Sequence, residues 1–404
     1  MADLESAKQK ACKAIDRAAT DLNSLSQEIW NKPELGYEEN SAHQVLTDFL
    51  EKNGFNVERK FAVDTAFRAT FGSQENSGIN ACVICEYDAL PEIGHACGHN
   101  PIAEAGAGAG LGIKAAMEAA GRPLGKLTVM GTPAEEGGAG KFKLIDAGAF
   151  QDIDLAMMVH PANLACMASP SFLAYTLFDV TFQGKASHAA YAPWEGVNAL
   201  DAAVMFYQGM SVMRQQVKST WRIHGIISNG GAKPNIIPEK TVVNYQLRTP
   251  TEVELSELKE RALACAEGAA KSTGCTMEYT YHSGYSNVVH NKPLIKLFVN
   301  NAEGLGVKFM PESEVAKRSN GSTDMGNVTY EVPGIHPMFC LETDAVIHSR
   351  GFTKAAGAPE AQEPTLVQAK AMAMTVLDVF FHGEDAMKQI REDFEEDMKK
   401  NKGK

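Results

Sequence analysis

The sequence predicts an α/β protein in which a doubly wound parallel sheet lies between helices and is interrupted by a smaller ferredoxin-like α+β domain. Up to about residue 160, short apolar segments of strand length alternate with helix-length segments, as in a parallel sheet with crossover helices. From residue 173 the order becomes strand, helix, strand, strand, helix, strand, which is the ferredoxin-like plan. Because strand signals return at 334–339, we expect one domain from 1–172 and 286–404, with 173–285 inserted into it.

Apolar periodicity gives the elements of the first domain. Residues 4–32 carry apolar side chains at helical spacing, among them Ile15, Leu22 and Ile29. A second helix is expected over 40–53, ending at Gly54. The alternating segments that follow are strand 79–86, helix 102–120, strand 127–132, helix 139–148 and strand 155–159.

The inserted domain and the tail are read in the same way. A charged helical tail is expected from about Asp378 onward. The inserted elements are strand 173–185, helix 195–217, strands 222–228 and 240–248, helix 253–272 and strand 275–283.

Composition narrows the class of protein. The chain has 404 residues, 22% of them charged, and a formal net charge of -12, which argues against a nucleic-acid partner or an anionic membrane surface. It has no apolar run near the roughly 18 residues of a membrane span, and Met1–Glu5 lacks the features of a secretory signal. Eight scattered cysteines do not form a disulfide scaffold. We therefore expect a cytoplasmic protein with reduced thiols.

Two patterns suggest chemistry that their context argues against. Gly106, Gly108 and Gly110 resemble part of a dinucleotide fingerprint, but they lie inside a predicted helix rather than directly after a strand. Close packing of that helix on the sheet explains them better. Cys82 and Cys85 have redox-pair spacing, yet strand residues three apart point to opposite faces, so both are expected in the core.

The segment Gly94–Asn100 is the most informative part of the chain. It places Cys97 and His99 two residues apart, just after an apolar strand. Thiolate and neutral imidazole are ligands that a zinc-type ion prefers. A buried cysteine beside surface histidines is the alternative for this segment taken alone.

Other segments bring metal-type ligands to the same edge of the predicted sheet. The strand at 127–132 leads to Glu135 and Glu136, the strand at 155–159 to His160, and the late strand to His348. Because open α/β sheets bind ligands beyond the carboxyl ends of their strands, we expect these side chains to converge.

The paired carboxylates suggest a division of roles. A hydrolytic metal site needs one carboxylate to bind the ion and another to accept the proton of the attacking water. Glu136 as ligand and Glu135 as base fit that division. The alternative is an exposed acidic pair at a helix N-terminus, where the helix dipole favours negative charge.

Long blocks of the sequence also resemble a known family, the aminoacylase and carboxypeptidase-G-type family of metal-dependent exopeptidases and amidohydrolases. The resemblance is strongest to its branch of dipeptidases that prefer a basic C-terminal residue. The blocks that carry it are Asn31–Glu39, Glu86–Asn100, Gly131–Lys141, Gly184–Ala202, His224–Pro238 and Gly321–Val328.

The resemblance implies a zinc-exopeptidase-like catalytic domain, a lid domain through which the chain forms a homodimer, and a centre of one or two divalent ions (zinc, with manganese or cobalt as alternatives). Glu135 matches the general base and Asp88 an acid that supports the metal shell. In the lid, His188 matches a histidine that stabilises the oxyanion across the dimer, and Asn235 and Arg248 match substrate-binding residues. The matched ligands are Cys97, His99, Glu136, His160 and His348.

The expected activity is hydrolysis of small dipeptides that end in lysine, ornithine or arginine, including β-alanyl-lysine-type dipeptides. Hydrolysis of N-acyl amino acids or aryl-glutamate conjugates is the neighbouring alternative. A cysteine nucleophile at Cys97, or a non-catalytic relative that kept the fold, are alternatives from other classes. His336 competes with His348 for the last ligand position, and Asp324 and Glu195 are candidate partners for a basic substrate side chain.

Overall fold

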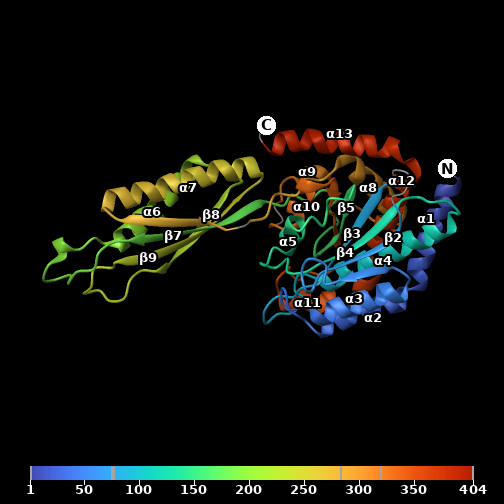
Figure 1. Ribbon diagram of the computed structural model, residues 1–404, viewed down its shortest axis with the longest axis horizontal. Coiled ribbons are helices and arrows are strands. Elements are labelled where there is room, and N and C mark those ends of the chain that lie inside the picture. The colour runs from blue at the N-terminus through green and yellow to red at the C-terminus, as the bar shows by residue number, and fades with distance from the viewer. Residues whose placement is uncertain (1, 74–77, 283, 319–320, 403–404) are drawn as a thin grey trace. The chain divides into compact units, whose positions relative to one another are not determined.

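The computed structural model describes residues 2–73, 78–282, 284–318 and 321–402. The chain forms two compact units, whose elements are labelled in Figure 1. The first unit consists of Met1–Ser171 and Val288–Lys400, and the second of Phe172–Asn287 with Asn401–Lys404. In the described part of the chain, no helix is both long enough and apolar enough to cross a membrane.

The first unit is built on a six-stranded sheet with the order β1-β2-β4-β3-β5-β11. Strands β4, β3, β5 and β11 run parallel to one another, and β1 and β2 extend the β4 side as antiparallel strands. This arrangement confirms the α/β fold class, although the sequence pattern did not reveal β1 and β2. The strands are β1 (Asn56–Arg59), β2 (Phe67–Gly72), β3 (Asn80–Glu86), β4 (Lys126–Thr132), β5 (Leu155–Met157) and β11 (Gly334–Ile335).

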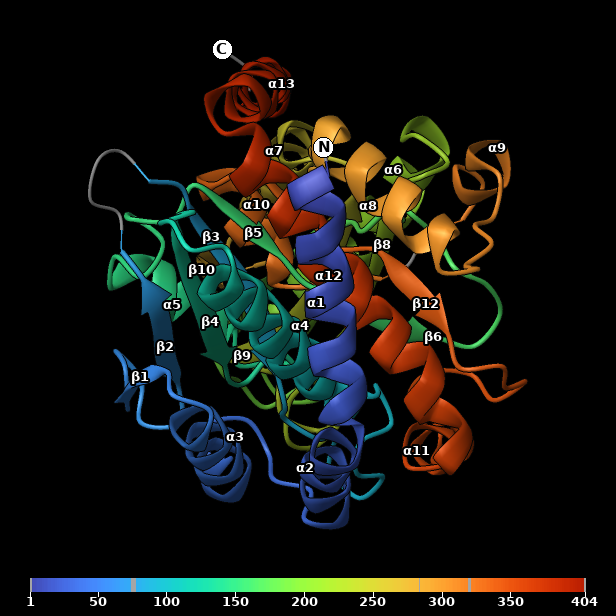
Figure 2. The same ribbon diagram turned by 90° about the vertical axis from the view of Figure 1, so that its right-hand side faces the viewer.

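Helices cover both faces of this sheet. On one face α1 (Ala2–Arg17), α4 (His99–Ala119) and α12 (Gln362–His382) pack against one another, and Figure 2 shows them side by side. On the other face α5 (Gly140–Asp146) packs against α10 (Met325–Glu331). Because both faces are covered, β3 is buried along its whole length.

Alternate residues of β3 enter two different apolar cores. Cys85 belongs to the core beneath α1, α4 and α12, whereas Cys82 belongs to the core beneath α5 and α10. The two thiols therefore serve packing, as expected. Gly106 also serves packing, because a Cβ at this position would lie 2.6 Å from the Ile84 carbonyl oxygen on β3.

Two predicted elements of the first unit are divided in the structure. The helix expected over 4–32 is interrupted at Ala18, where α2 (Ala19–Asn31) begins and turns to pack on α3 (Asn40–Lys52) and α4. Apolar spacing continues through this break and so does not reveal it. The late strand is split at Pro337, after which β12 (Met338–Cys340) leaves the main sheet and pairs with β6 (His160–Ala162).

The remaining helices of the first unit lie in its C-terminal half. The charged helical tail expected from about Asp378 onward is α13, which begins later, at Glu384, because Asp378 is a buried residue of α12. They are α8 (Lys292–Gly304), α9 (Glu312–Val315), α11 (Arg350–Ala356), the short 3-10 helix η3 (Pro359–Ala361) and α13 (Glu384–Asn401).

The second unit has the ferredoxin-like order β7-α6-β8-β9-α7-β10. Its four strands form an antiparallel sheet in the order β10-β7-β9-β8, so β8 is an edge strand. The strand predicted to end at Ser283 ends earlier, and that residue lies outside the described part of the chain. The bounds are β7 (Ala174–Gln183), η1 (Pro193–Glu195), α6 (Ala199–Met213), η2 (Arg214–Gln216), β8 (Arg222–Asn229), β9 (Lys240–Thr249), α7 (Glu252–Thr273) and β10 (Thr276–Tyr281).

Candidate metal centre

The candidate ligands of the first unit follow the carboxyl ends of its parallel strands. Strand β3 ends at Glu86, two residues before Asp88, and the neighbouring β4 ends three residues before Glu135. Glu86 and Thr132 are register partners, so the two strands end at the same level. His160 is the first residue of β6, which follows β5. The parallel sheet thus brings these segments to one edge.

A glycine between the two ligands of the central motif makes their approach to His160 possible. Gly98 precedes α4 with a φ of +80°, in the left-handed region that glycine adopts without strain. A Cβ at Gly98 would lie 2.6 Å from Cγ of Pro161. The absence of a side chain therefore lets Pro161 pack on the motif, and Cys97 Sγ lies 3.4 Å from His160 Nε2.

The loop that carries His348 is tied to the same motif. The His348 N–H donates to the carbonyl oxygen of Ala96, at 2.8 Å. His348 adopts a left-handed φ of 65°, which is uncommon for a residue with a side chain and costs energy. Its Nε2 lies 3.2 Å from Glu136 Oε1. The strained backbone thus coincides with a close approach of two candidate ligands.

Three groups of donor atoms, each within 4.8 Å, form at this edge. Cys97 belongs to two of these groups, one with His99 and His160 and one with Glu136 and His348. Two donors of one tetrahedral zinc-type ion lie roughly 3.4–3.6 Å apart, close to the 3.4 Å between Cys97 and His160 and the 3.2 Å between His348 and Glu136. The groups are Cys97, His99 and His160; Cys97, Glu136 and His348; and Glu86, His99 and Glu135.

Asp88 orients two of these ligands from behind. Its Oδ1 lies 3.0 Å from His99 Nδ1, and its Oδ2 accepts the Glu136 backbone N–H at 2.9 Å. His99 Nε2 faces the donor groups, fully buried and without a hydrogen bond within the described ranges, with the Glu86 carboxylate 3.2 Å away. A buried nitrogen in that position is costly unless it has a partner. The residues therefore fit a metal ion.

Burial and neighbouring charges shift the pKa values of the ligands. Burial lowers the pKa of His160 to about 4, which keeps its imidazole neutral and able to bind a cation. Burial also raises the pKa of the Cys97 thiol well above its usual value, so a thiolate needs a nearby cation here. That shift argues against a metal-free cysteine nucleophile.

The two paired carboxylates have opposite electrostatic environments. Burial, followed by repulsion from Glu86 and Glu136, raises the pKa of Glu135 well above its usual value. Burial also acts to raise the pKa of Glu136, but the hydrogen bond from His348 and the charge of His99 outweigh it and lower that pKa. When the pKa values of two neighbouring carboxyl groups are shifted in opposite directions, one group can stay ionised while the other exchanges protons.

A buried lysine lies directly behind the centre. Lys141 Nζ contacts Glu86 Oε2 and lies 2.6 Å from Asp324 Oδ1, and all three side chains are buried. The Lys141 backbone N–H also donates to Asp324, at 2.9 Å. No pattern in the sequence assigned a role to Glu86 or Lys141. Their place inside two of the resemblance blocks was the available signal.

His336, the rival of His348, is placed differently. Its ring stacks on His160 with a centroid separation of 5.6 Å. Burial, followed by the charge of His160, lowers the pKa of His336 well below its usual value. None of the three donor groups found among the described residues includes it, whereas His348 belongs to one of them.

The candidate substrate residues lie in the second unit. His188 and Asn235 are on adjacent exposed segments, where the Ala189 N–H donates to the Asn235 carbonyl at 3.1 Å. Arg248 is on β9, half-buried, with its guanidinium 4.9 Å from the centre of the Tyr175 ring. The structure thus brings His188 and Asn235 together on neighbouring loops.

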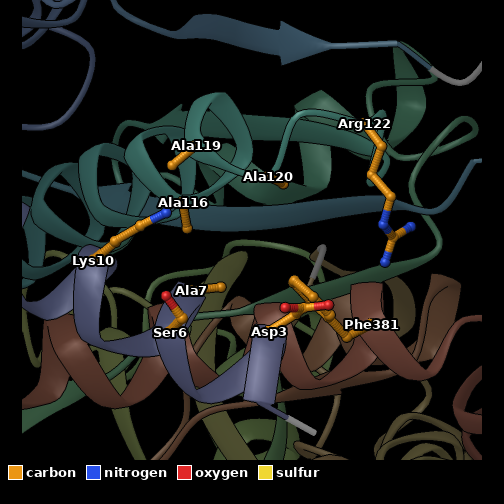
Figure 3. Close-up of a pocket in the computed structure, with 9 residues that line it drawn as sticks. All are labelled: Asp3, Ser6, Ala7, Lys10, Ala116, Ala119, Ala120, Arg122 and Phe381. Carbon is orange, nitrogen blue, oxygen red and sulfur yellow. The ribbon is translucent and has the colours of Figure 1, made fainter.

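A separate pocket in the first unit involves none of these residues. Figure 3 shows it beside α1 and the C-terminal end of α4, with Asp3 and Lys10 on one side and Arg122 on another. None of its lining residues belongs to the donor groups. It is therefore distinct from the candidate metal centre.

The fold and the donor groups together define a class of protein. Thiolate, imidazole and carboxylate donors at the carboxyl edge of a parallel sheet support a divalent metal. A carboxylate with a raised pKa beside them suits proton transfer. This is the arrangement expected of a metal-dependent hydrolase.

Comparisons with known proteins agree with that class. The chain is 48% identical to Xaa-Arg dipeptidase from Mus musculus, over 94% of this chain and 90% of the relative. It is 31% identical to one of the subunits of p-aminobenzoyl-glutamate hydrolase from Escherichia coli, over 70% and 62% of the two chains. A dinuclear metal-binding peptidase of the M20 family from Bacillus subtilis has the same fold, with a TM-score of 0.71 and 18% identity over 91% of this chain and 99% of that one.

The second unit also has a family match. Residues 175–274 match the model of the peptidase dimerisation domain of the M20 family. Together with the near full-length similarity to a dipeptidase, this shows that the chain belongs to the M20 peptidase family and is a hydrolase.

Proposed function

We propose that this protein hydrolyses the amide bond of small dipeptides whose C-terminal residue is basic, namely lysine, ornithine or arginine, β-alanyl-lysine-type dipeptides included. The similarity to Xaa-Arg dipeptidase over nearly the whole of both chains carries this proposal. The similarity to p-aminobenzoyl-glutamate hydrolase supports the alternative, an amidohydrolase of N-acyl amino acids or aryl-glutamate conjugates.

We assign the ligand role to Cys97, His99, Glu136, His160 and His348. Because Cys97 belongs to two donor groups, it could contribute to both ions of a two-ion centre, which is the centre we propose. A thiolate with two or three imidazoles favours zinc, with manganese and cobalt as alternatives. Bound metal would polarise the scissile carbonyl and lower the pKa of a water ligand.

Glu135 is the proposed general base. Its side chain is buried against Glu136 and Glu86, in a position closed to most solvent. A raised pKa suits a carboxylate that accepts a proton from water and then donates it to the leaving amine. Asp88 is assigned to hold His99 and the Glu136 backbone in place.

The second unit is proposed to supply the substrate contacts. His188 would stabilise the oxyanion, Asn235 would hold the substrate, and the fork of Arg248 suits a C-terminal carboxylate. Of the two acidic candidates for a basic side chain, Asp324 is buried and paired with Lys141. Glu195 is exposed, with only a loose contact of 3.9 Å to Lys185, so it is the better candidate.

We further propose that the chain forms a homodimer through its second unit. The edge strand β8 exposes Ile226, which is 64% accessible, and α6 exposes Val212, which is 70% accessible. Unpaired strand edges and exposed apolar side chains favour association. The match to a dimerisation domain supports the same surface.

We also propose that the protein works in a reducing compartment such as the cytoplasm. All eight of its cysteines are free thiols, and free thiols are typical of such compartments.

The test is a substrate panel on one metal-loaded preparation. It compares β-alanyl-lysine and β-alanyl-arginine with β-alanyl-alanine, an N-acetyl amino acid and p-aminobenzoyl-glutamate, with and without a chelator. We expect chelator-sensitive turnover of the two basic dipeptides, with kcat/KM at least about tenfold above that of the others. Turnover of only the last two compounds would select the alternative function. Turnover that resists the chelator would contradict the metal centre.

A further inference from the structure

We propose that Glu86 is a further metal ligand of this protein, an assignment that rests on the proposed metal centre and adds a donor to it. Glu86 is the last residue of β3 and is completely buried. Its Oε1 lies 3.2 Å from His99 Nε2. Neither atom makes a hydrogen bond in the part of the chain that the structure describes.

The geometry of His99 determines which ion Glu86 would bind. His99 Nδ1 is held by Asp88, so Nε2 is the nitrogen that can face an ion. One imidazole nitrogen has one lone pair and binds one ion. His99 belongs both to the group with Cys97 and His160 and to the group with Glu86. Glu86 would therefore share an ion with His99, although the donor groups do not place it within 4.8 Å of both Cys97 and His160.

The second carboxylate oxygen of Glu86 explains how the first is aimed. Oε2 contacts Lys141 Nζ, and Lys141 is in turn held by Asp324 through both its ammonium and its backbone N–H. The buried lysine neutralises Glu86 on one side and fixes its orientation. Oε1 is left as a single donor pointing at His99, and outer partners of this kind orient metal ligands.

This assignment makes the two ions unequal. An ion held by His99 would gain Glu86 as a further protein donor. The group of Cys97, Glu136 and His348 has three donors and so retains the open position that a reacting water or substrate needs. His348, whose side chain is 52% exposed, lies on the solvent side of that group.

The test titrates Co²⁺ into metal-free protein, followed by calorimetry and by visible absorption, which reports coordination. For Glu86→Gln we expect the affinity of one of two ions to fall by at least about 10–100-fold, the range known for outer-shell partners, with an altered spectrum. Glu86→Asp keeps the charge next to Lys141 but shortens the reach, and is expected to weaken the same ion. Glu104→Gln, a buried carboxyl on α4 outside the donor groups, is the matched control and should bind as the wild type does.

The outcomes separate this inference from the proposed function. Wild-type Co²⁺ affinity and spectrum in folded Glu86→Gln and Glu86→Asp would overturn the inference and leave the metal centre intact. Failure of the wild-type protein to bind Co²⁺ would overturn both. If Glu86→Gln does not fold, Glu86→Asp decides the matter.

Discussion

The donor groups of the first unit and the His188 loop of the second differ in how completely their own chain surrounds them. His99 and Glu86 are fully buried, and each has charged neighbours from other segments. His188 is exposed, and its Nδ1 accepts the backbone N–H groups of Ala190 and Tyr191, each at 3.2 Å. The first region thus has its charged groups paired within one unit, whereas the second presents an exposed imidazole.

The difference has a physical origin. Burial of several carboxylates and imidazoles is costly unless each is paired, so the first unit must fix them through Asp88, Lys141 and, in our proposal, metal. An exposed histidine loses little hydration and remains available to contact a substrate or a second copy of the chain. Substitutions in the two regions should therefore have different consequences: loss of metal in the first, and loss of turnover with metal retained in the second.

The largest effect is expected for Cys97→Ser, because Cys97 alone belongs to both groups assigned to ions. Replacing the thiolate should lower the affinity for both ions by more than about a hundredfold, beyond the range of outer-shell partners. Metal analysis of the purified protein after dialysis measures this. Cys166→Ser, at a half-buried cysteine outside the groups, is the control. A dialysed Cys97→Ser protein with full metal content would refute the shared-ligand assignment.

The next effect, on turnover alone and without loss of metal, is expected for His188→Ala. Removing one oxyanion donor lowers kcat by about 10²–10³-fold, whereas metal content should stay at the wild-type level because the ligands lie in the other unit. Steady-state kinetics and metal analysis on the same sample check both halves. His282→Ala changes another exposed histidine of the second unit and should retain activity. Equal kinetics for the two variants would remove His188 from the proposed mechanism.

The smallest effect concerns stability away from both regions. Burial raises the pKa of Glu104 to about 7 from an ordinary 4.5, so the folded protein holds a proton there that the unfolded chain releases. This contribution is fully present below about pH 4.5 and is lost as the pH rises through 7. Glu104→Gln should therefore gain stability relative to wild type between pH 5 and 8, by on the order of 3 kcal/mol.

Chemical denaturation of the wild type and of Glu104→Gln at pH 5 and at pH 8 measures this difference in stability. Glu118→Gln, an exposed carboxylate on the same helix, should show no such trend. A stability difference between Glu104→Gln and wild type that does not change with pH would contradict the raised pKa.

The sequence predicted the fold class because local residue patterns identify each strand and helix in turn, as they do for β3, α4 and β4. It did not predict the break at Ala18, where no glycine or proline marks the turn, or the split of the late strand, which depends on pairing with β6. The convergence of Cys97, Glu136 and His160 was foreseen from the ends of parallel strands. Glu86 and Lys141 were not, because a carboxylate ending a strand reveals neither its burial nor a lysine 55 residues away.

The most direct measurement of the central claim combines metal content with turnover of β-alanyl-lysine, on the same samples of wild type and Glu135→Gln. The wild type should contain bound metal and hydrolyse the dipeptide. Glu135→Gln should keep the same metal content while turnover falls by about 10²–10⁴-fold, since only the proton acceptor is lost. A wild-type protein that binds no metal, or a Glu135→Gln protein as active as wild type, would contradict the account.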